Sequence, residues 1–152
     1  MYHYLLILHS YFRWLVLFAL LFQIVWIFIN HRKNKVFSSK DYQILIGLTI
    51  IYDIQFFIGW VLYLNSPLVT AFWKDISIGI KTRQLRFFGL EHMSMMTLAV
   101  MIINIVTLLV KRKVGSNGFT YLWKRYIWIG LMILTSIPWS FSPFTNRPNF
   151  RF

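Results

Sequence analysis

Four long apolar runs separated by short basic segments constrain the fold of this chain more than any other feature. The runs cover about residues 4–30, 42–65, 87–110 and 121–139, and each is long enough to cross a bilayer as a helix. Because hydrocarbon offers no hydrogen-bonding partner to a peptide group, each run is predicted to be helical. The sequence therefore predicts an all-α protein, an integral membrane four-helix bundle with up-down-up-down order, formed as a single domain by residues 1–152.

The charge of the chain fits this membrane assignment. Sixteen Lys and Arg face four Asp and Glu, and the net charge of +12 would also suit a nucleic-acid-binding protein. However, 58% of the residues are hydrophobic, and the basic residues stand in short clusters between the apolar runs. We therefore expect the lipid bilayer as a partner, and no nucleic acid. The chain has no Cys, which excludes iron–sulfur clusters and attached c-type haem, so any iron would need histidine.

The basic residues are unevenly divided between the two sides of the predicted bundle. The connections after the first and third runs, with the start of the fourth run, carry nine Lys and Arg. The connection at residues 65–84, the residues just after it and the C-terminal tail carry six, over longer stretches. Under the positive-inside rule, this bias places the N-terminus outside. The first run lacks a basic leader and a small-residue cleavage site, so we expect it to remain as a span.

A few polar side chains lie within the predicted spans, where each costs about 2.5 to 3.5 kcal/mol and needs a partner or a function. In the first span, His9, Arg13 and Gln23 share one face, because the last two lie about 40° to either side of His9. In the second span, Asp53 lies near the middle. Gln55 points about 200° away from Asp53 toward a different neighbour, and Gly59 on the same side as Gln55 allows a close approach.

In the third span, Glu91 and His92 lie next to each other near the start, and Asn104 lies deeper in the span. His92 and His9 each lie about one and a half turns in from the outer end of their span, so the two histidines share a depth. The first and third helices of such a bundle are diagonal, which leaves room for a planar cofactor between them. Asp53 and Asn104 are expected to be too far apart to form a path across the membrane.

Two histidines on facing helices can ligate the iron of haem b. The sequence thus predicts His9 and His92 as metal ligands. Arginines near the outer surface could bind the haem propionates in bidentate fashion. The predicted cofactor-binding set is His9, Arg13, Arg86, His92 and Arg147, with Arg83 as a further candidate for the propionates.

An alternative interpretation leaves the histidines in a structural polar network of Asp53, Gln55 and Glu91. In that case His9 bonds to Glu91, and the chain is a non-catalytic accessory subunit that holds neighbouring proteins or anionic lipids. An ion pair between Arg13 and Asp53 is expected under either interpretation.

Two other ligands are weighed for the same region. A quinone head group could accept hydrogen bonds from His and Arg. Cuprous copper could bind the thioethers that follow His92, but it is not favoured, because methionine is an ordinary filler of apolar space. These methionines are Met93, Met95 and Met96. No hydrolytic constellation appears, and the sequence does not decide whether the protein is an enzyme.

Several strings in the chain resemble a family of small four-span bacterial membrane proteins that are labelled cytochrome-B-like. The strings are LHSYFRW at 8–14, DIQFFIGWVLY at 53–63, SP at 66–67, LRFFGLEHMSMM at 85–96, IPW at 137–139 and RP at 147–148. The likeness runs nearly end to end. It implies haem b bound by His9 and His92, and its matching polar positions are His9, Arg13, Asp53, Gln55, Arg86, Glu91, His92 and Arg147.

The sequence and the resemblance together predict a multi-pass protein of a bacterial inner membrane that carries one electron at a time through a single haem b near the outer face. With a haem near one surface only, transfer across the membrane would require a partner. We therefore expect exchange with a quinol or with other membrane subunits of a respiratory complex.

Overall fold

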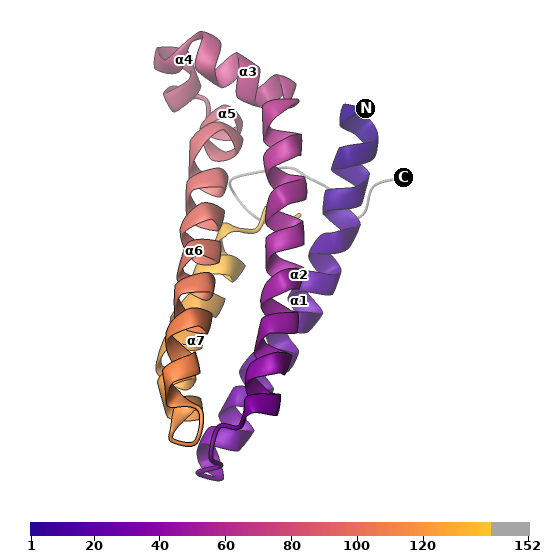
Figure 1. Cartoon of the computed structure of the whole chain (residues 1–152). Helices are drawn as coiled ribbons and strands as arrows, with labels where there is room; N and C mark the ends of the chain where they lie inside the picture. Colours follow the sequence, from indigo (N-terminus) through magenta and orange to yellow (C-terminus); the bar gives the residue numbers. More distant parts are fainter. Residues whose placement is uncertain (141–152) are drawn as a thin grey trace.

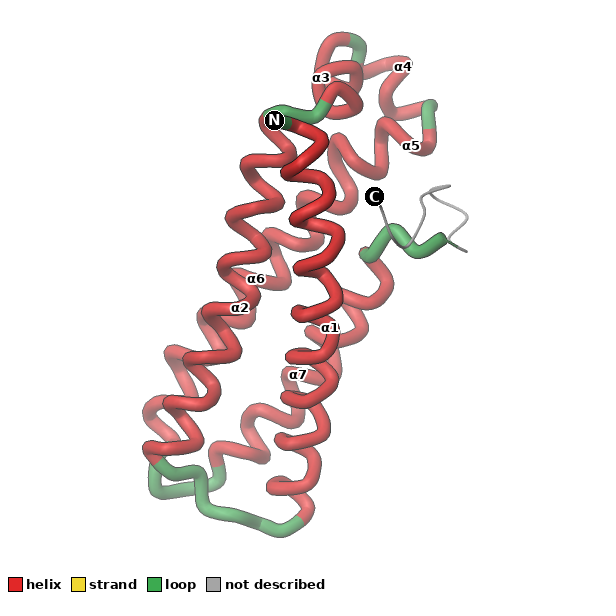
Figure 2. The backbone as a smooth tube through the Cα atoms, turned by 90° about the vertical axis from the view of Figure 1, so that its right-hand side faces the viewer, coloured by secondary structure: helices red, strands yellow, loops and turns green. Residues whose placement is uncertain are grey.

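The computed structural model of the protein describes residues 1–140, and every regular element in this part of the chain is a helix (Figure 1). The prediction of an all-α protein is therefore confirmed. Four helices are long: α1 (Tyr2–Arg32), α2 (Ser39–Leu64), α6 (His92–Val110) and α7 (Gly118–Ser136). Helix α1 packs against α2 and α7, and α6 packs against the same two helices, so α1 and α6 are diagonal (Figures 1 and 2).

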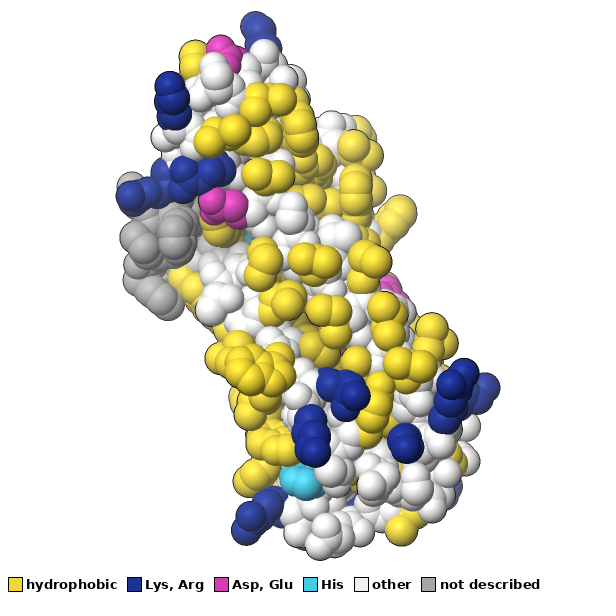
Figure 3. Space-filling model, turned by 90° about the vertical axis from the view of Figure 1, so that its left-hand side faces the viewer, with side chains coloured by type: hydrophobic (Ala, Val, Ile, Leu, Met, Phe, Trp, Pro, Cys, Tyr) yellow, Lys and Arg dark blue, Asp and Glu magenta, His cyan; other side chains and the backbone are white. Residues whose placement is uncertain are grey.

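Three helical segments of the described chain are long and apolar enough to cross a membrane: residues 2–32, 39–64 and 83–113. The sequence predicted a fourth span at 121–139, but α7, with 19 residues that include Lys124 and Arg125, is not among these segments. Hydrophobic side chains cover the middle of the molecule, and Lys and Arg gather toward its two ends (Figure 3). The length and apolar composition of these helices identify the chain as a membrane protein.

The longest connection, predicted only as an interruption of the apolar runs, contains three short helices. They are α3 (Pro67–Lys74), α4 (Ile76–Lys81) and α5 (Arg83–Arg86), and they cover the end of α2 and α6 (Figure 1). We call residues 67–86 the cap. Phe72 is 2% exposed, and a Cβ added to Gly79 would lie 2.7 Å from its ring. The cap therefore packs around the Phe72 ring, and at position 79 only glycine leaves room for that ring.

The segment that follows the cap continues without a break into α6. A single π-helical turn (Phe87–Glu91) joins α5 to α6, and a short 3₁₀ turn (Lys111–Lys113) ends the segment. Tyr63 at the end of α2 donates a hydrogen bond of 2.8 Å to the carbonyl of Gly89 within the π turn. Single π turns inside helices are frequent at functional sites, and this one directly precedes His92.

At the opposite end of the molecule, the connections before α2 and before α7 are hydrogen-bonded to each other. The amide of Phe37 donates to Ser116 at 3.0 Å, and the amide of Gly115 donates to Phe37 at 2.8 Å. Gly115 has φ +82°, a conformation that favours glycine. The Phe37 ring is fully buried against Phe119, with ring centroids 5.1 Å apart. The hydrophobic core fills this half of the bundle, where all four long helices are present.

We predict that Gly118→Ala destabilises the fold by about 1–3 kcal/mol, because an added Cβ would lie 2.6 Å from Cγ of the buried Phe37 ring and would overpack it. Gly47→Ala is the matched control, since no atom lies within 4 Å of its added Cβ. In the middle of α2, that change should stabilise by about 0.5–1 kcal/mol. Thermal unfolding in detergent, monitored by circular dichroism, measures the melting temperatures of the two variants. Equal melting temperatures for both variants would contradict the packing around Phe37.

Candidate functional site

The candidate site exists because α7 ends before its neighbours do. Helix α7 has 19 residues and α1 has 31, which corresponds to about 28 Å against about 46 Å. Pro138 follows the last helical residue closely and cannot continue the helix. Beyond Ser136, only α1, α2 and α6 face one another. A cavity of about 160 Å³ lies at this level and is lined from all four long helices.

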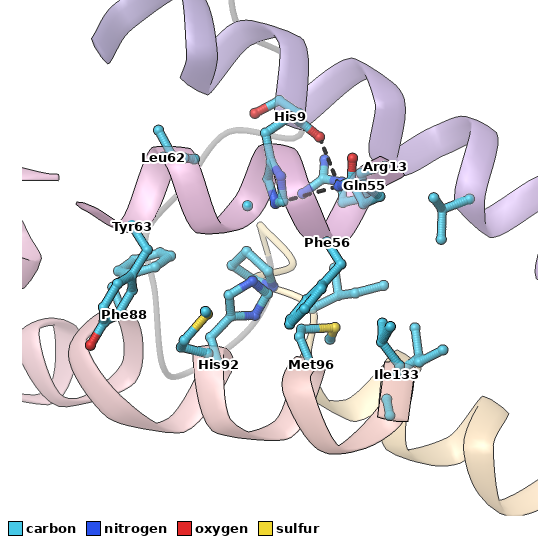
Figure 4. A pocket seen from close by; sticks show the side chains of 18 of the residues that line it. His9, Arg13, Gln55, Phe56, Leu62, Tyr63, Phe88, His92, Met96 and Ile133 are labelled. Carbon is cyan, nitrogen blue, oxygen red and sulfur yellow. Dashed lines mark hydrogen bonds between the residues drawn. The ribbon is translucent and has the colours of Figure 1, made fainter. Parts of the chain in front are cut away.

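His9 of α1 and His92 of α6 point toward one another across this cavity (Figure 4). Their ring centroids are 6.5 Å apart and their planes are nearly perpendicular, at 88°. The two imidazoles thus come from diagonal helices at a common depth. Most of the remaining lining is apolar or aromatic and includes Phe56, Leu62, Phe88, Met96 and Ile133, while Arg13 and Gln55 add polar groups beside the pair (Figure 4).

The end of α7 orients the His92 ring. Nδ1 of His92 lies 2.7 Å from the carbonyl oxygen of Ser136, one of the carbonyls that a helix C-terminus leaves without an intrahelical partner. A carbonyl can only accept, so Nδ1 carries the proton and Nε2 keeps its lone pair. The ring also stacks on Phe87, with centroids 5.7 Å apart. Helix α7 therefore ends at the level of the cavity, where its Ile133 forms part of the lining, and it fixes the tautomer of His92.

Helix α2 positions His9. Nε2 of Gln55 donates to the backbone carbonyl of His9 at 3.1 Å, which fixes the orientation of the amide, and lies 3.4 Å from Nε2 of the ring. One turn further along α2, a Cβ added to Gly59 would lie 3.1 Å from Cε1 of His9. Gln55 and Gly59 thus share a face, as the periodicity predicted, and that face contacts His9. Nδ1 of His9 is buried, and no residue of the described chain bonds to it.

Arg13 lines the same cavity one turn from His9, with its guanidinium carbon 5.3 Å from the centre of the Trp14 ring. The predicted ion pair between Arg13 and Asp53 is wrong. The carboxylate of Asp53 accepts a hydrogen bond of 2.8 Å from Asn104 instead. Asp53 and Asn104, expected to be far apart, are therefore direct partners on α2 and α6.

Two further predicted site residues, Arg86 and Glu91, lie away from the cavity. Nε of Arg86 donates to Glu91 at 2.6 Å, and Nη1 of Arg86 donates to the carbonyl of Ile80 at 2.9 Å. This pair ties the cap to the start of α6, so the alternative bond between His9 and Glu91 does not form. Neither Arg86 nor Glu91 lines the cavity. Arg147 lies outside the described residues.

Of the three methionines that follow His92, two line the cavity and one does not, as expected for neighbouring positions on a helix. Met93 and Met96 line the cavity beside His92, and Met95 is not among its lining residues. In residues 1–140, no group of three or more His, Cys, Asp or Glu side chains is arranged to hold a metal ion. Among the His, Cys, Asp and Glu side chains of residues 1–140, His9 and His92 are the two that line the cavity.

One polar contact at the base of the cavity was missed in the sequence. Tyr52 of α2 lines the cavity, is 2% exposed and donates a hydrogen bond of 2.6 Å to Oε1 of the fully buried Gln23. The sequence places Gln23 on the face of His9 and Arg13 but predicts no partner for it. A tyrosine at the depth of a buried glutamine on the neighbouring helix is the signal that could have identified this pair.

The fold and the site define an all-helical membrane protein with a histidine-lined cavity near one end. Comparisons with protein-family models, with curated proteins and with solved structures find no match for the chain. The resemblance to cytochrome-B-like proteins therefore stays a prediction.

We predict that Tyr52→Phe lowers the free energy of unfolding by about 1–3 kcal/mol, because it leaves the buried Gln23 amide without its donor. Tyr52→Phe combined with Gln23→Leu should recover much of this loss, since both polar partners are then removed. Tyr4→Phe is the control, because Tyr4 is 77% exposed. Thermal melts of the four proteins test the pair, and a double variant that is no more stable than Tyr52→Phe would contradict the coupling of the two side chains.

Proposed function

We propose that the protein is a b-type cytochrome-like membrane protein that exchanges single electrons through one haem b held by His9 and His92. The observation that carries the proposal is the pair of imidazoles facing each other across the cavity, with ring centroids 6.5 Å apart. Bonds of about 2 Å from one metal to a nitrogen of each ring would place the ring centres roughly 6 Å apart. The observed separation therefore suits a single metal between the rings.

The number of ligands favours haem over a bare ion. A bare transition metal needs three or four protein ligands, and the described chain offers no such group of His, Cys, Asp and Glu. A porphyrin supplies its own four nitrogen ligands, so two axial imidazoles complete the iron. Met93 and Met96 are the side chains that could extend the pair for cuprous copper, which makes copper the metal to test against iron.

The residues around the pair support the same assignment. Metal-binding histidines commonly donate their second ring N–H to a backbone carbonyl, and His92 does so to Ser136. Gln55 holds the backbone of His9, and the Arg13 guanidinium adds positive charge at the cavity wall. The lining around the pair is mostly apolar. A bound haem would supply a one-electron couple, whose potential depends on this lining and on the axial ligands.

We propose that the chain crosses a bacterial inner membrane four times, with α7 as the fourth crossing in an up-down-up-down bundle. The basic connections at residues 33–38 and 111–117 would lie inside, and the N-terminus and the cap outside. His9 lies seven residues from the start of α1, or about 10 Å, so the cavity would be close to the outer surface. The electron partner would therefore act from that side, as a quinol or a neighbouring subunit.

We predict that the protein purified from a haem-replete membrane shows a Soret band and, when reduced, a sharp α-band. His9→Ala and His92→Ala should each remove most of the haem, because each takes away one of the two iron ligands. His31→Ala is the matched control, since His31 lies at the far end of α1 and contacts Thr120 at 3.0 Å. The measurement is the pyridine haemochrome yield per folded protein, with iron and copper quantified in the same samples.

A folded but colourless wild-type protein would contradict the proposal and support the accessory-subunit interpretation. Stoichiometric copper without haem would assign the histidine pair to copper instead. Equal haem retention in the His31→Ala, His9→Ala and His92→Ala proteins would show that the haem binds elsewhere.

A further prediction concerns the position of His9. Gly59→Ala should push the imidazole away from α2, because the added Cβ would lie 3.1 Å from Cε1 of His9. We expect a shifted reduction potential and faster loss of haem to apomyoglobin, with secondary structure unchanged. Gly47→Ala, on the same helix and with no neighbour within 4 Å, should behave like the wild type. Identical potentials in all three proteins would argue that α2 does not set the position of this ligand.

A further inference from the structure

A single carboxylate lies in the middle of an apolar helix face. Asp53 is 14 residues from the start of α2 and 11 residues from its end, which places it near the centre of the apolar segment. It is partly exposed on the outside of the bundle, away from the cavity that Gln55 faces. A carboxylate at this depth in hydrocarbon costs several kcal/mol unless it is paired or protonated.

The hydrogen bonds around Asp53 leave only acceptors facing outward. Nδ2 of Asn104 donates to Oδ1 of Asp53 at 2.8 Å and to the carbonyl of Val100 at 3.0 Å, so both hydrogens of the amide are used. Within residues 1–140, the second carboxylate oxygen of Asp53 and the amide oxygen of Asn104 accept no hydrogen bond. The pair therefore presents oxygen atoms alone to any neighbour.

The side chains around this pair form a matched apolar frame. Ile50 and Phe57 lie one turn to either side of Asp53 on α2 and are 50% and 69% exposed. Met101 and Leu108 have the same relation to Asn104 on α6 and are 54% and 67% exposed. Since α2 packs against α6, the four residues surround the two polar groups on one continuous face. We call these six residues the Asp53 face.

Within residues 1–140, no Lys or Arg forms an ion pair with Asp53. The ion pairs among the described residues are Lys35 with Asp41 and Arg86 with Glu91, both at the ends of the bundle. A second copy would not supply a cation, because a two-fold interface sets identical patches against each other and would bring acceptors against acceptors. A complementary neighbour must bring a donor or a cation.

We propose that the Asp53 face binds a transmembrane helix of a partner protein that carries a Lys or Arg at its midpoint. The cation would pair with the free oxygen of Asp53, and the apolar frame would pack along the partner helix above and below it. Polar contacts between helices in membranes contribute about 1–2 kcal/mol, enough to select a partner helix by one residue. This inference does not depend on haem, because the Asp53 face and the cavity lie on different sides of α2.

The test uses the full chain reconstituted in phosphatidylcholine vesicles. The protein contains no Cys, so Val36→Cys, at a residue 58% exposed, gives a single site for a donor fluorophore. Synthetic leucine-rich transmembrane helices carry the acceptor and differ only in their central residue, which is Lys, Leu or Glu. We expect energy transfer to show the Lys helix binding about tenfold more tightly than the Leu helix, and the Glu helix no more tightly than the Leu helix.

Asp53→Asn should remove the preference for the Lys helix, and Asp53→Glu should keep it. Asp75→Asn, which changes an exposed carboxylate in the cap, is the control and should leave the preference for the Lys helix unchanged. Equal binding of the Lys and Leu helices to the wild-type protein would overturn the proposal, whatever the folding of the variants. Persistence of the Lys preference in a folded Asp53→Asn protein would overturn it too. Energy transfer between labelled copies that disappears in Asp53→Asn would assign the face to self-association instead.

Discussion

The hydrogen bond between His92 and the carbonyl of Ser136 is the contact on which the rest of the site depends. It forms at the level where α7 stops, so the same helix end that opens the cavity also satisfies one ring nitrogen of a histidine inside it. A longer α7 would fill the space between α1 and α6 with side chains, and a shorter one would leave the imidazole without an acceptor. The cavity and the orientation of its ligand are thus one feature of the backbone.

The polar groups inside the bundle are divided into separate pairs rather than joined in one network. His9 is held by Gln55, Tyr52 by Gln23 and Asp53 by Asn104, and each pair joins α2 to a neighbouring helix. Helix α2 therefore carries most of the polar contacts between helices, although its composition is as apolar as that of the others. The pairs satisfy only part of their polar groups, because within residues 1–140 Nδ1 of His9, Nε2 of Gln23 and Oε1 of Gln55 are buried without a partner. The apolar core fills the opposite end of the bundle.

The sequence predicted the helices and the level of the histidine pair, because both follow from run length and from rise per residue. It predicted the shared face of Gln55 and Gly59 from helical periodicity. Periodicity fixes which residues share a face but not which neighbour that face meets, so the partner of Asp53 was assigned to the wrong helix. The cap was missed as well, because its short helices depend on Phe72 packing against glycines that are distant in the sequence.

The two unusual features of α2 lie on different sides of one helix and differ in chemistry. The side toward the cavity presents Gln55 and Gly59, which bring the backbone close to His9 and leave room for a ligand. The other side presents Asp53 among exposed apolar residues, where a neighbouring helix could cover the carboxylate. A helix with a cavity on one side and an acceptor on the other would couple an internal cofactor to an external partner through a rigid element. Displacement of α2 by a partner helix would then act on the position of His9, because Gly59 brings the α2 backbone next to the His9 ring and Gln55 binds the His9 backbone carbonyl.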